Sequence, residues 1–301
     1  MNNKETSPGI KRILWATDFS EESRFCLPYI KIFSAALSTK NHALYVLPKF
    51  SDWVVETAFA SEDELAKTIA KIKEQSITKI VSTSKKSNIT FEPQVIEGRI
   101  TNEEIIKYAK EKGIDLIFAG RRGISEIEEI LIGSTTSRLI RNSDIPLLII
   151  PKAQRILKIK KILCPIDFSE HSMKELEYAI FLSRHLRAQL FVVHIAEFFN
   201  YKVPLFKMEM LISKINKKIE EIAEKHRFKI ENIIHDTGEP AKKIIEIAKE
   251  KNVDIITMAT HQRKGIGKFF LGSISEKVLL YSNIPVLILP PPRPKDKNEH
   301  D

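Results

Sequence analysis

A glycine-rich segment carries the residue types of an anion-binding loop. It runs from Gly120 to Thr135 and reads GRRGISEIEEILIGST. Gly120 and Gly123 allow a ligand to approach the backbone closely. Gly133 and Ser134 lie where a helix is predicted to begin, so free backbone N–H groups and the positive end of the helix dipole would face the same point. The spacing predicts a phosphate site. The alternative is that the glycines only mark the turn between a strand and the next helix.

Positive charge and hydroxyls accompany these glycines. Arg121 and Arg122 stand between the first two glycines and add positive charge to the predicted site. Ser134 and Thr135 are helix-cap residues first, and contact with a phosphate is their second role. A separate candidate is Asp18, whose carboxylate could accept hydrogen bonds from a ribose or a base. Asp18 could equally cap its own turn, next to Ser20 as the predicted helix cap.

The elements that must position these residues occur twice in the chain. Lys11 to Ser23 reads KRILWATDFSEES and Lys160 to Ser172 reads KKILCPIDFSEHS, with eight of thirteen positions identical. The blocks that end in IDLIFAG and VDIITMA, and those that contain IGSTTSRL and LGSISEKV, repeat in the same order. The separation of about 140 to 150 residues indicates duplication of a whole domain. The first copy is here the segment from Lys11 to Pro151, and the second copy the segment from Lys160 to Pro290.

Each copy alternates short apolar runs with segments of helical periodicity. In the first copy strands are predicted at 13–17, 42–47, 90–96, 115–119 and 146–150, and helices at 24–37, 62–81, 102–112 and 134–141. Fully apolar strands separated by helices indicate a parallel sheet with helices on both faces. Open sheets of this kind bind ligands beyond the carboxyl ends of the strands, where the strand order reverses. The loops at Asp18 and Gly120 are therefore the expected site.

These motifs resemble those of the universal stress protein family. The run Gly120, two residues, Gly123, nine residues, Gly133 and then Ser134 looks like the family's ATP signature, and the resemblance covers nearly the whole chain, twice. It implies an adenine nucleotide alpha hydrolase-like fold: two tandem, open, parallel five-stranded α/β sheets with strand order 3-2-1-4-5. It also implies ATP, with Mg²⁺, in the first copy. The cofactor-binding residues it implies are Ala16, Thr17, Asp18, Val46, Gly120, Arg121, Arg122, Gly123, Gly133, Ser134 and Thr135.

The second copy departs from this signature. Counting back from Gly272 and Ser273 places Ala259 and Gln262 where the first copy has Gly120 and Gly123, although Asp167 and Ile195 remain. A side chain where a glycine would face a phosphate adds bulk and restricts positive φ. We therefore expect the second copy to bind ATP weakly or not at all.

Length, charge and cysteine content limit the remaining interpretations. The 301 residues suggest two domains, predicted at 1–153 and 154–292, followed by a disordered tail at 293–301. The net charge is +9. Because the lysines are interleaved with glutamates, the charge pattern favours a solvated surface over a nucleic-acid partner. No apolar run approaches the ~18 residues of a membrane span. With two cysteines at no metal-like spacing and no secretion signal, a cytoplasmic location and no metal site of the protein's own are expected.

Three functions stay open at this point. The first is an ATP-binding stress or signalling protein whose output is a conformational change. The second is a slow ATPase or nucleotidyl-transfer enzyme, although the chain has no P-loop lysine motif and no assigned catalytic residue. The third is a nucleotide-free scaffold. The apolar terminal strands at 146–150 and 285–289 further predict that the two copies pair within one chain as an intramolecular pseudo-dimer. A homodimer of chains and a protein partner are left open.

Overall fold

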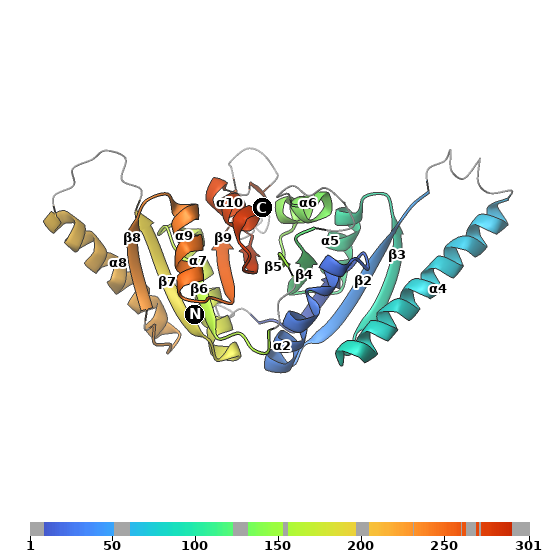
Figure 1. Cartoon of the computed structure of the whole chain (residues 1–301), viewed down its shortest axis with the longest axis horizontal. Helices are drawn as coiled ribbons and strands as arrows, with labels where there is room; N and C mark the ends of the chain where they lie inside the picture. The colour runs from blue at the N-terminus through green and yellow to red at the C-terminus, as the bar shows by residue number, and fades with distance from the viewer. Residues whose placement is uncertain are drawn as a thin grey trace, which may run out of the picture. The chain divides into compact units, whose positions relative to one another are not determined.

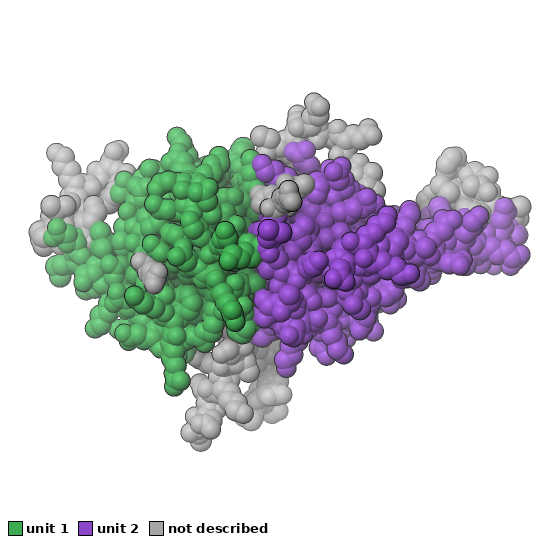
Figure 2. Space-filling view, turned by 60° about the horizontal axis from the view of Figure 1, so that its bottom comes forward, with its two compact units in different colours: residues 1–8, 140–147, 158–301 green, residues 9–139, 148–157 purple. Residues whose placement is uncertain are grey.

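The structure is a computed structural model of the whole chain. It describes residues 9–50, 61–122, 132–152, 156–196, 205–230, 232–259, 261–262, 269–270 and 272–290. Gly123 and the predicted tail at 293–301 lie outside these residues. By contacts, residues 9–139 and 148–157 form one compact unit, and residues 140–147 and 158–301 belong to the other (Figure 2).

The first copy is an open parallel α/β domain (Figure 1). Its strands, in the spatial order β3-β2-β1-β4-β5, are β1 (Arg12–Ala16), β2 (Lys40–Pro48), β3 (Glu92–Gly98), β4 (Leu116–Gly120) and β5 (Leu147–Ile150). Its helices are α1 (Glu21–Arg24), α2 (Leu27–Leu37), α4 (Glu62–Ser87), α5 (Thr101–Glu111) and α6 (Ser134–Asn142). The observed order is the predicted 3-2-1-4-5.

The second copy repeats this arrangement. Its strands follow the order β8-β7-β6-β9-β12 and are β6 (Lys161–Pro165), β7 (Gln189–Ala196), β8 (Asn232–Thr237), β9 (Ile255–Ala259) and β12 (Val286–Leu289). Its helices are α7 (Glu170–Leu186), α8 (Leu205–Lys225), α9 (Pro240–Glu250) and α10 (Ser273–Tyr281). A short antiparallel pair, β10 (His261–Gln262) with β11 (Phe269–Phe270), has no counterpart in the sequence-based prediction.

The central strands are buried on both faces. All five residues of β4 and all five of β9 are buried. Because successive side chains of a strand point to opposite faces of the sheet, complete burial requires cover on both sides. Helices contribute to this cover: α1 contacts β4 while α4 and α5 pack on β2 and β3, and in the second copy α7 packs on β6, β7 and β9 while α9 packs on β7 and β8. The apolar runs of the sequence therefore predicted the layers correctly.

One predicted helix is divided in two. The segment 24–37 was predicted as a single helix, but α1 ends at Arg24 and α2 begins at Leu27, with Pro28 in its first turn. Proline has no backbone N–H and its ring clashes with the carbonyl four residues earlier, which here is Arg24. The second copy has Glu177 at the position of Pro28, and its helix α7 runs unbroken from Glu170 to Leu186.

Candidate functional site

The loop after β1 is fixed by hydrogen bonds within the loop. The Oδ1 atom of Asp18 accepts hydrogen bonds from the backbone N–H (3.0 Å) and the hydroxyl (2.5 Å) of Ser20. Ser20 in turn caps α1 by accepting a hydrogen bond from the N–H of Ser23, as predicted. Phe19 adopts a left-handed conformation with φ of 64°, and Phe168 repeats it in the second copy at 65°. Asp18 therefore holds the turn with one carboxylate oxygen, and its carboxylate still borders a cavity.

The loop after β4 is anchored at both of its ends. The N–H of Arg121 donates to the carbonyl of Ile150 at 2.8 Å, and the N–H of Gly133 donates to the carbonyl of Arg121 at 2.9 Å. The hydroxyl of Thr136 donates to the carbonyl of Gly120 at 2.9 Å. These bonds hold the first turn of α6 against the end of β4, the arrangement expected from the order of the elements.

Gly120 is required by protein packing. A Cβ at this position would lie 2.9 Å from the carbonyl oxygen of Glu22 and 3.0 Å from that of Arg122. Both contacts are with backbone atoms, which cannot move aside as a flexible side chain can. The glycine thus brings α1 close to the end of β4, a structural role that the sequence reading gave as its alternative.

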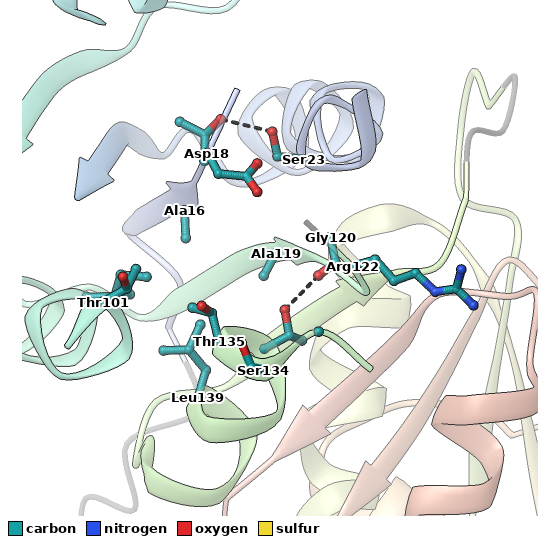
Figure 3. Close-up of a pocket in the computed structure, with 14 residues that line it drawn as sticks. Ala16, Asp18, Ser23, Thr101, Ala119, Gly120, Arg122, Ser134, Thr135 and Leu139 are labelled. Carbon is teal, nitrogen blue, oxygen red and sulfur yellow. Dashed lines mark hydrogen bonds between the residues drawn. The ribbon is translucent and has the colours of Figure 1, made fainter. Parts of the chain in front are cut away.

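The two loops enclose a polar cavity of about 200 Å³ at the carboxyl ends of β1 and β4 (Figure 3). Figure 3 shows Asp18 on one side of β4 and Ser134 with Thr135 on the other, whereas the side chain of Arg122 extends away from Thr101 and Leu139. Eight of the predicted residues line the cavity: Ala16, Thr17, Asp18, Gly120, Arg122, Gly133, Ser134 and Thr135. Val46 and Arg121 are not among the described lining residues; Val46 is buried on β2, where it pairs with Ile96 of β3.

Sequence reasoning missed six lining residues. They are Ser23, Thr101, Ile105, Ala119, Thr136 and Leu139. The signal for Thr101 and Thr136 was available, because each lies in the first turn of a helix that follows a strand, and such turns face the carboxyl edge of the sheet. Ile105 and Leu139 supply an apolar part of the lining, and helical periodicity cannot tell such residues from core residues.

The cavity has the donors that an anion requires. The first backbone N–H groups of α6 have no partner within their own helix. Within the described part of the chain, the hydroxyls of Thr101, Ser134 and Thr135 make no side-chain hydrogen bond. Burial, and then the neighbouring charge of Arg122, lower the pKa of the half-buried Arg121 below its ordinary value. An anion near these two adjacent cations would relieve their repulsion.

The thiol nearest to this site is not reactive. Cys26 is completely buried next to the loop of Asp18, and burial, followed by the charge of Asp18, raises the pKa of its thiol. A thiol that keeps its proton is a poor nucleophile and a poor metal ligand. Cys164 of the second copy is also buried, so both cysteines are core residues. In the described part of the chain no cluster of three or more metal-ligating side chains is present.

The comparisons with known proteins agree with this geometry. The sequence model of the universal stress protein family matches residues 9–151 and again residues 158–290. The chain belongs to the universal stress protein family. Universal stress protein Slr1230 of Synechocystis is 23% identical over 295 residues, which cover 92% of this chain and 99% of that protein. This relative is similar along both copies, so the tandem arrangement is shared.

Further relatives match a single copy or the fold alone. Universal stress protein MJ0531 of Methanocaldococcus jannaschii is 29% identical over 143 residues, 44% of this chain and 84% of the relative. A crystal structure of a universal stress protein from Archaeoglobus fulgidus superposes with a TM-score of 0.69 at 23% identity, covering 93% of this chain and 98% of that one. No helix in the described part of this universal stress protein is both long and apolar enough to cross a membrane.

Proposed function

We propose that the first copy binds an adenine nucleotide, ATP with Mg²⁺, and that binding changes the conformation of this universal stress protein in stress response or signalling. The observation that carries the proposal is the cavity at the ends of β1 and β4, which is lined by Ser134 and Thr135 at the start of α6 and bordered by Arg122. This donor set suits phosphate oxygens, and its place at the reversal of strand order is where open α/β sheets take ligands.

The residues fit the phosphates better than they fit a metal ion. The N–H groups and hydroxyls of Ser134 and Thr135, with Arg122, would hold phosphate oxygens. Among the described lining residues Asp18 is the only carboxylate, and its Oδ1 is engaged by Ser20. Magnesium bound here would accordingly be held chiefly by the phosphates and by water, as is usual for nucleotide-bound Mg²⁺.

The size of the cavity supports a conformational output. Sites for small molecules usually enclose ~300–1,000 Å³, whereas this cavity has about 200 Å³. We infer that a whole nucleotide extends beyond this cavity and displaces part of its lining as it binds. The lining includes the loop of Asp18 and the first turn of α6, so displacement of these two segments would couple nucleotide binding to the shape of the domain.

Calorimetry with Mg-ATP on the intact chain tests the proposal. We expect one site per chain. The double variant Thr17→Ile with Thr135→Ile, which copies the residues Ile166 and Ile274 of the second copy, should weaken binding at least ~10-fold. It removes the hydroxyl of Thr135 at the start of α6, and it removes the hydroxyl of Thr17, which bonds to Phe19 and Ser23 within the loop of Asp18. Gly123→Gln, which copies Gln262, should also remove most binding.

Controls separate the outcomes. The reverse double variant, Ile166→Thr with Ile274→Thr, should leave the affinity of the first copy unchanged. No heat of binding in the unmodified chain would favour the nucleotide-free scaffold, and two equal sites would contradict the assignment to the first copy.

The pairing of the two copies within one chain stays a prediction. It rests on the equally apolar terminal strands of the two copies, which a tandem chain can satisfy internally. Sedimentation equilibrium, together with hydrogen exchange on the backbone of residues 146–150 and 285–289, tests it. Strong protection in a monomeric chain is expected, and rapid exchange of both strands would contradict the idea.

A further inference from the structure

The second copy contains a larger cavity at the place that corresponds to the candidate nucleotide site. It has a volume of about 480 Å³ and lies at the carboxyl ends of β6, β7 and β9. Ile166, Val193, Ile244 and Met258 give it apolar walls. This volume lies within the ~300–1,000 Å³ that is usual for sites that enclose a small organic molecule.

Three of the hydroxyls that line the first cavity are absent here, whereas Ser273 keeps the hydroxyl of Ser134. Thr17, Thr101 and Thr135 of the first copy correspond to Ile166, Pro240 and Ile274 of the second. Each replacement removes a hydrogen-bond donor from the wall. A phosphate that lost its water shell in this cavity would find the start of α10 and Ser273 but fewer side-chain partners to compensate for desolvation.

The described lining of the second cavity also lacks the cationic side chain of the first. Arg122 lines the first cavity, whereas no lysine or arginine is among the described residues that line the second. Two carboxyl groups, Asp167 and Glu175, line it instead. Asp167 corresponds to Asp18 of the first copy, so the second lining keeps this carboxyl group and lacks the positive charge of Arg122, which disfavours an anionic ligand.

Glu175 is built into the wall as a neutral acid. It stands at the position of Cys26 in the first copy and is only 2% exposed. Its Oε1 accepts hydrogen bonds from the hydroxyl of Thr257 at 2.6 Å and from the thiol of Cys164 at 3.6 Å, and its Oε2 accepts one from the N–H of Ala259 at 2.7 Å. The side chain is thereby fixed, which a loosely placed surface glutamate would not be.

Burial sets the charge of this carboxyl. It raises the pKa of Glu175 to about 8, against the opposing effect of the hydrogen bonds and with a small contribution from Asp167. At neutral pH the group therefore holds its proton. A neutral carboxyl tolerates an apolar neighbour far better than an ionised one, because only the ion loses a large hydration energy.

We propose that the second copy binds an uncharged, predominantly apolar small molecule in this cavity, in place of a nucleotide. The proposal rests on the lost hydroxyls, the lack of a described lysine or arginine in the lining, the fixed buried carboxyl and the volume. It does not depend on whether the first copy binds ATP.

Two dyes of the same skeleton test the proposal on the full chain. N-phenyl-1-naphthylamine is uncharged, and its relative 1-anilinonaphthalene-8-sulfonate carries a sulfonate; both fluoresce in apolar surroundings. We expect the uncharged dye to bind one site per chain and the sulfonate to bind at least ~10-fold more weakly at pH 7. Saturating Mg-ATP should not displace the uncharged dye. Equal affinity for both dyes, or displacement by Mg-ATP, overturns the proposal.

Variants locate the dye. Ile166→Thr with Ile274→Thr restores two hydroxyls and should weaken binding of the uncharged dye at least ~10-fold, whereas Thr17→Ile with Thr135→Ile in the first copy should leave it unchanged. Dye binding that is unchanged by Ile166→Thr with Ile274→Thr would contradict the assignment of the dye to this cavity.

The pH dependence gives a second, independent readout. The groups that face Glu175 are Cys164 of β6 and Asp167 of the following loop, and His194 of β7 lines the same cavity. Ionisation of Glu175 should weaken binding of the uncharged dye as the pH rises above about 8. Glu175→Gln should bind as the wild type does at pH 7 and lose this decline. An equal decline in both proteins contradicts the role of Glu175.

Discussion

Replacing the buried acid Glu175 by glutamine should change how the stability of the chain depends on pH. In the unfolded chain this carboxyl ionises near its ordinary pKa of 4.5, whereas burial raises the pKa to about 8 in the folded protein. Between these values the folded state holds a proton that the unfolded state has released. Rising pH therefore favours unfolding throughout this window.

The magnitude follows from the two pKa values. Each pH unit between 4.5 and about 8 carries ~1.4 kcal/mol, so the wild type should lose roughly 5 kcal/mol of unfolding free energy by pH 8 from this group. No allowance for solvent screening is needed because the residue is only 2% exposed. Glu175→Gln removes this loss, since an amide does not titrate.

The substitution has its own cost at low pH. The N–H of Ala259 needs the amide oxygen, so the NH₂ group takes the place of Oε1. The hydroxyl of Thr257 can rotate to accept one of its two N–H groups, whereas the other N–H faces the thiol of Cys164, a weak acceptor. A buried donor without an acceptor costs ~1–3 kcal/mol. We expect the variant to be less stable than the wild type at pH 5 and more stable at pH 8.

Urea unfolding at pH 5, 6, 7 and 8 measures this crossing. Both tryptophans, Trp15 and Trp53, lie in the first copy, so their fluorescence reports that copy, while circular dichroism reports both. Glu220→Gln, at an exposed position of α8, is the control and should give a constant difference from the wild type. A stability difference between Glu175→Gln and the wild type that stays flat from pH 5 to 8 would refute the reasoning.

Three further predictions follow from the first copy. Gly120→Ala should lower the unfolding free energy by ~1–3 kcal/mol in urea titrations, because its Cβ would lie 2.9 Å from the carbonyl oxygen of Glu22; Ala259→Gly is the matched change, and an unaltered midpoint in Gly120→Ala would count against the contact. Arg122→Ala should weaken Mg-ATP about 10-fold and reduce the salt dependence of binding in calorimetry; an unchanged salt dependence would remove Arg122 from the site. Hydrolysis of Mg-ATP should be slow or absent in a phosphate-release assay, because the only carboxylate of the described lining, Asp18, has one oxygen engaged by its own turn and no other general base is evident. Turnover near ~10 per second would contradict this expectation.

The sequence determined the architecture because the evidence for it is local and repeated. Apolar runs of strand length, helical periodicity and the duplicated blocks predicted two parallel α/β copies in the order that the structure shows. The caps were equally readable, since Ser20 and Ser169 each accept a hydrogen bond from an N–H three residues later. The division between α1 and α2 was also legible in Pro28, although periodicity alone concealed it.

The tertiary structure decided what the residues of each cavity do. Gly120 was read as space for a ligand, and the packing shows that it makes space for the carbonyl of Glu22. Glu175 was one glutamate among many in a charged chain, because its partners Thr257 and Ala259 lie 82 and 84 residues further along. A single sequence shows which residues are present and how they alternate. Burial and contacts between distant segments, which set the charge of a carboxyl and the character of a cavity, exist only once the chain has folded.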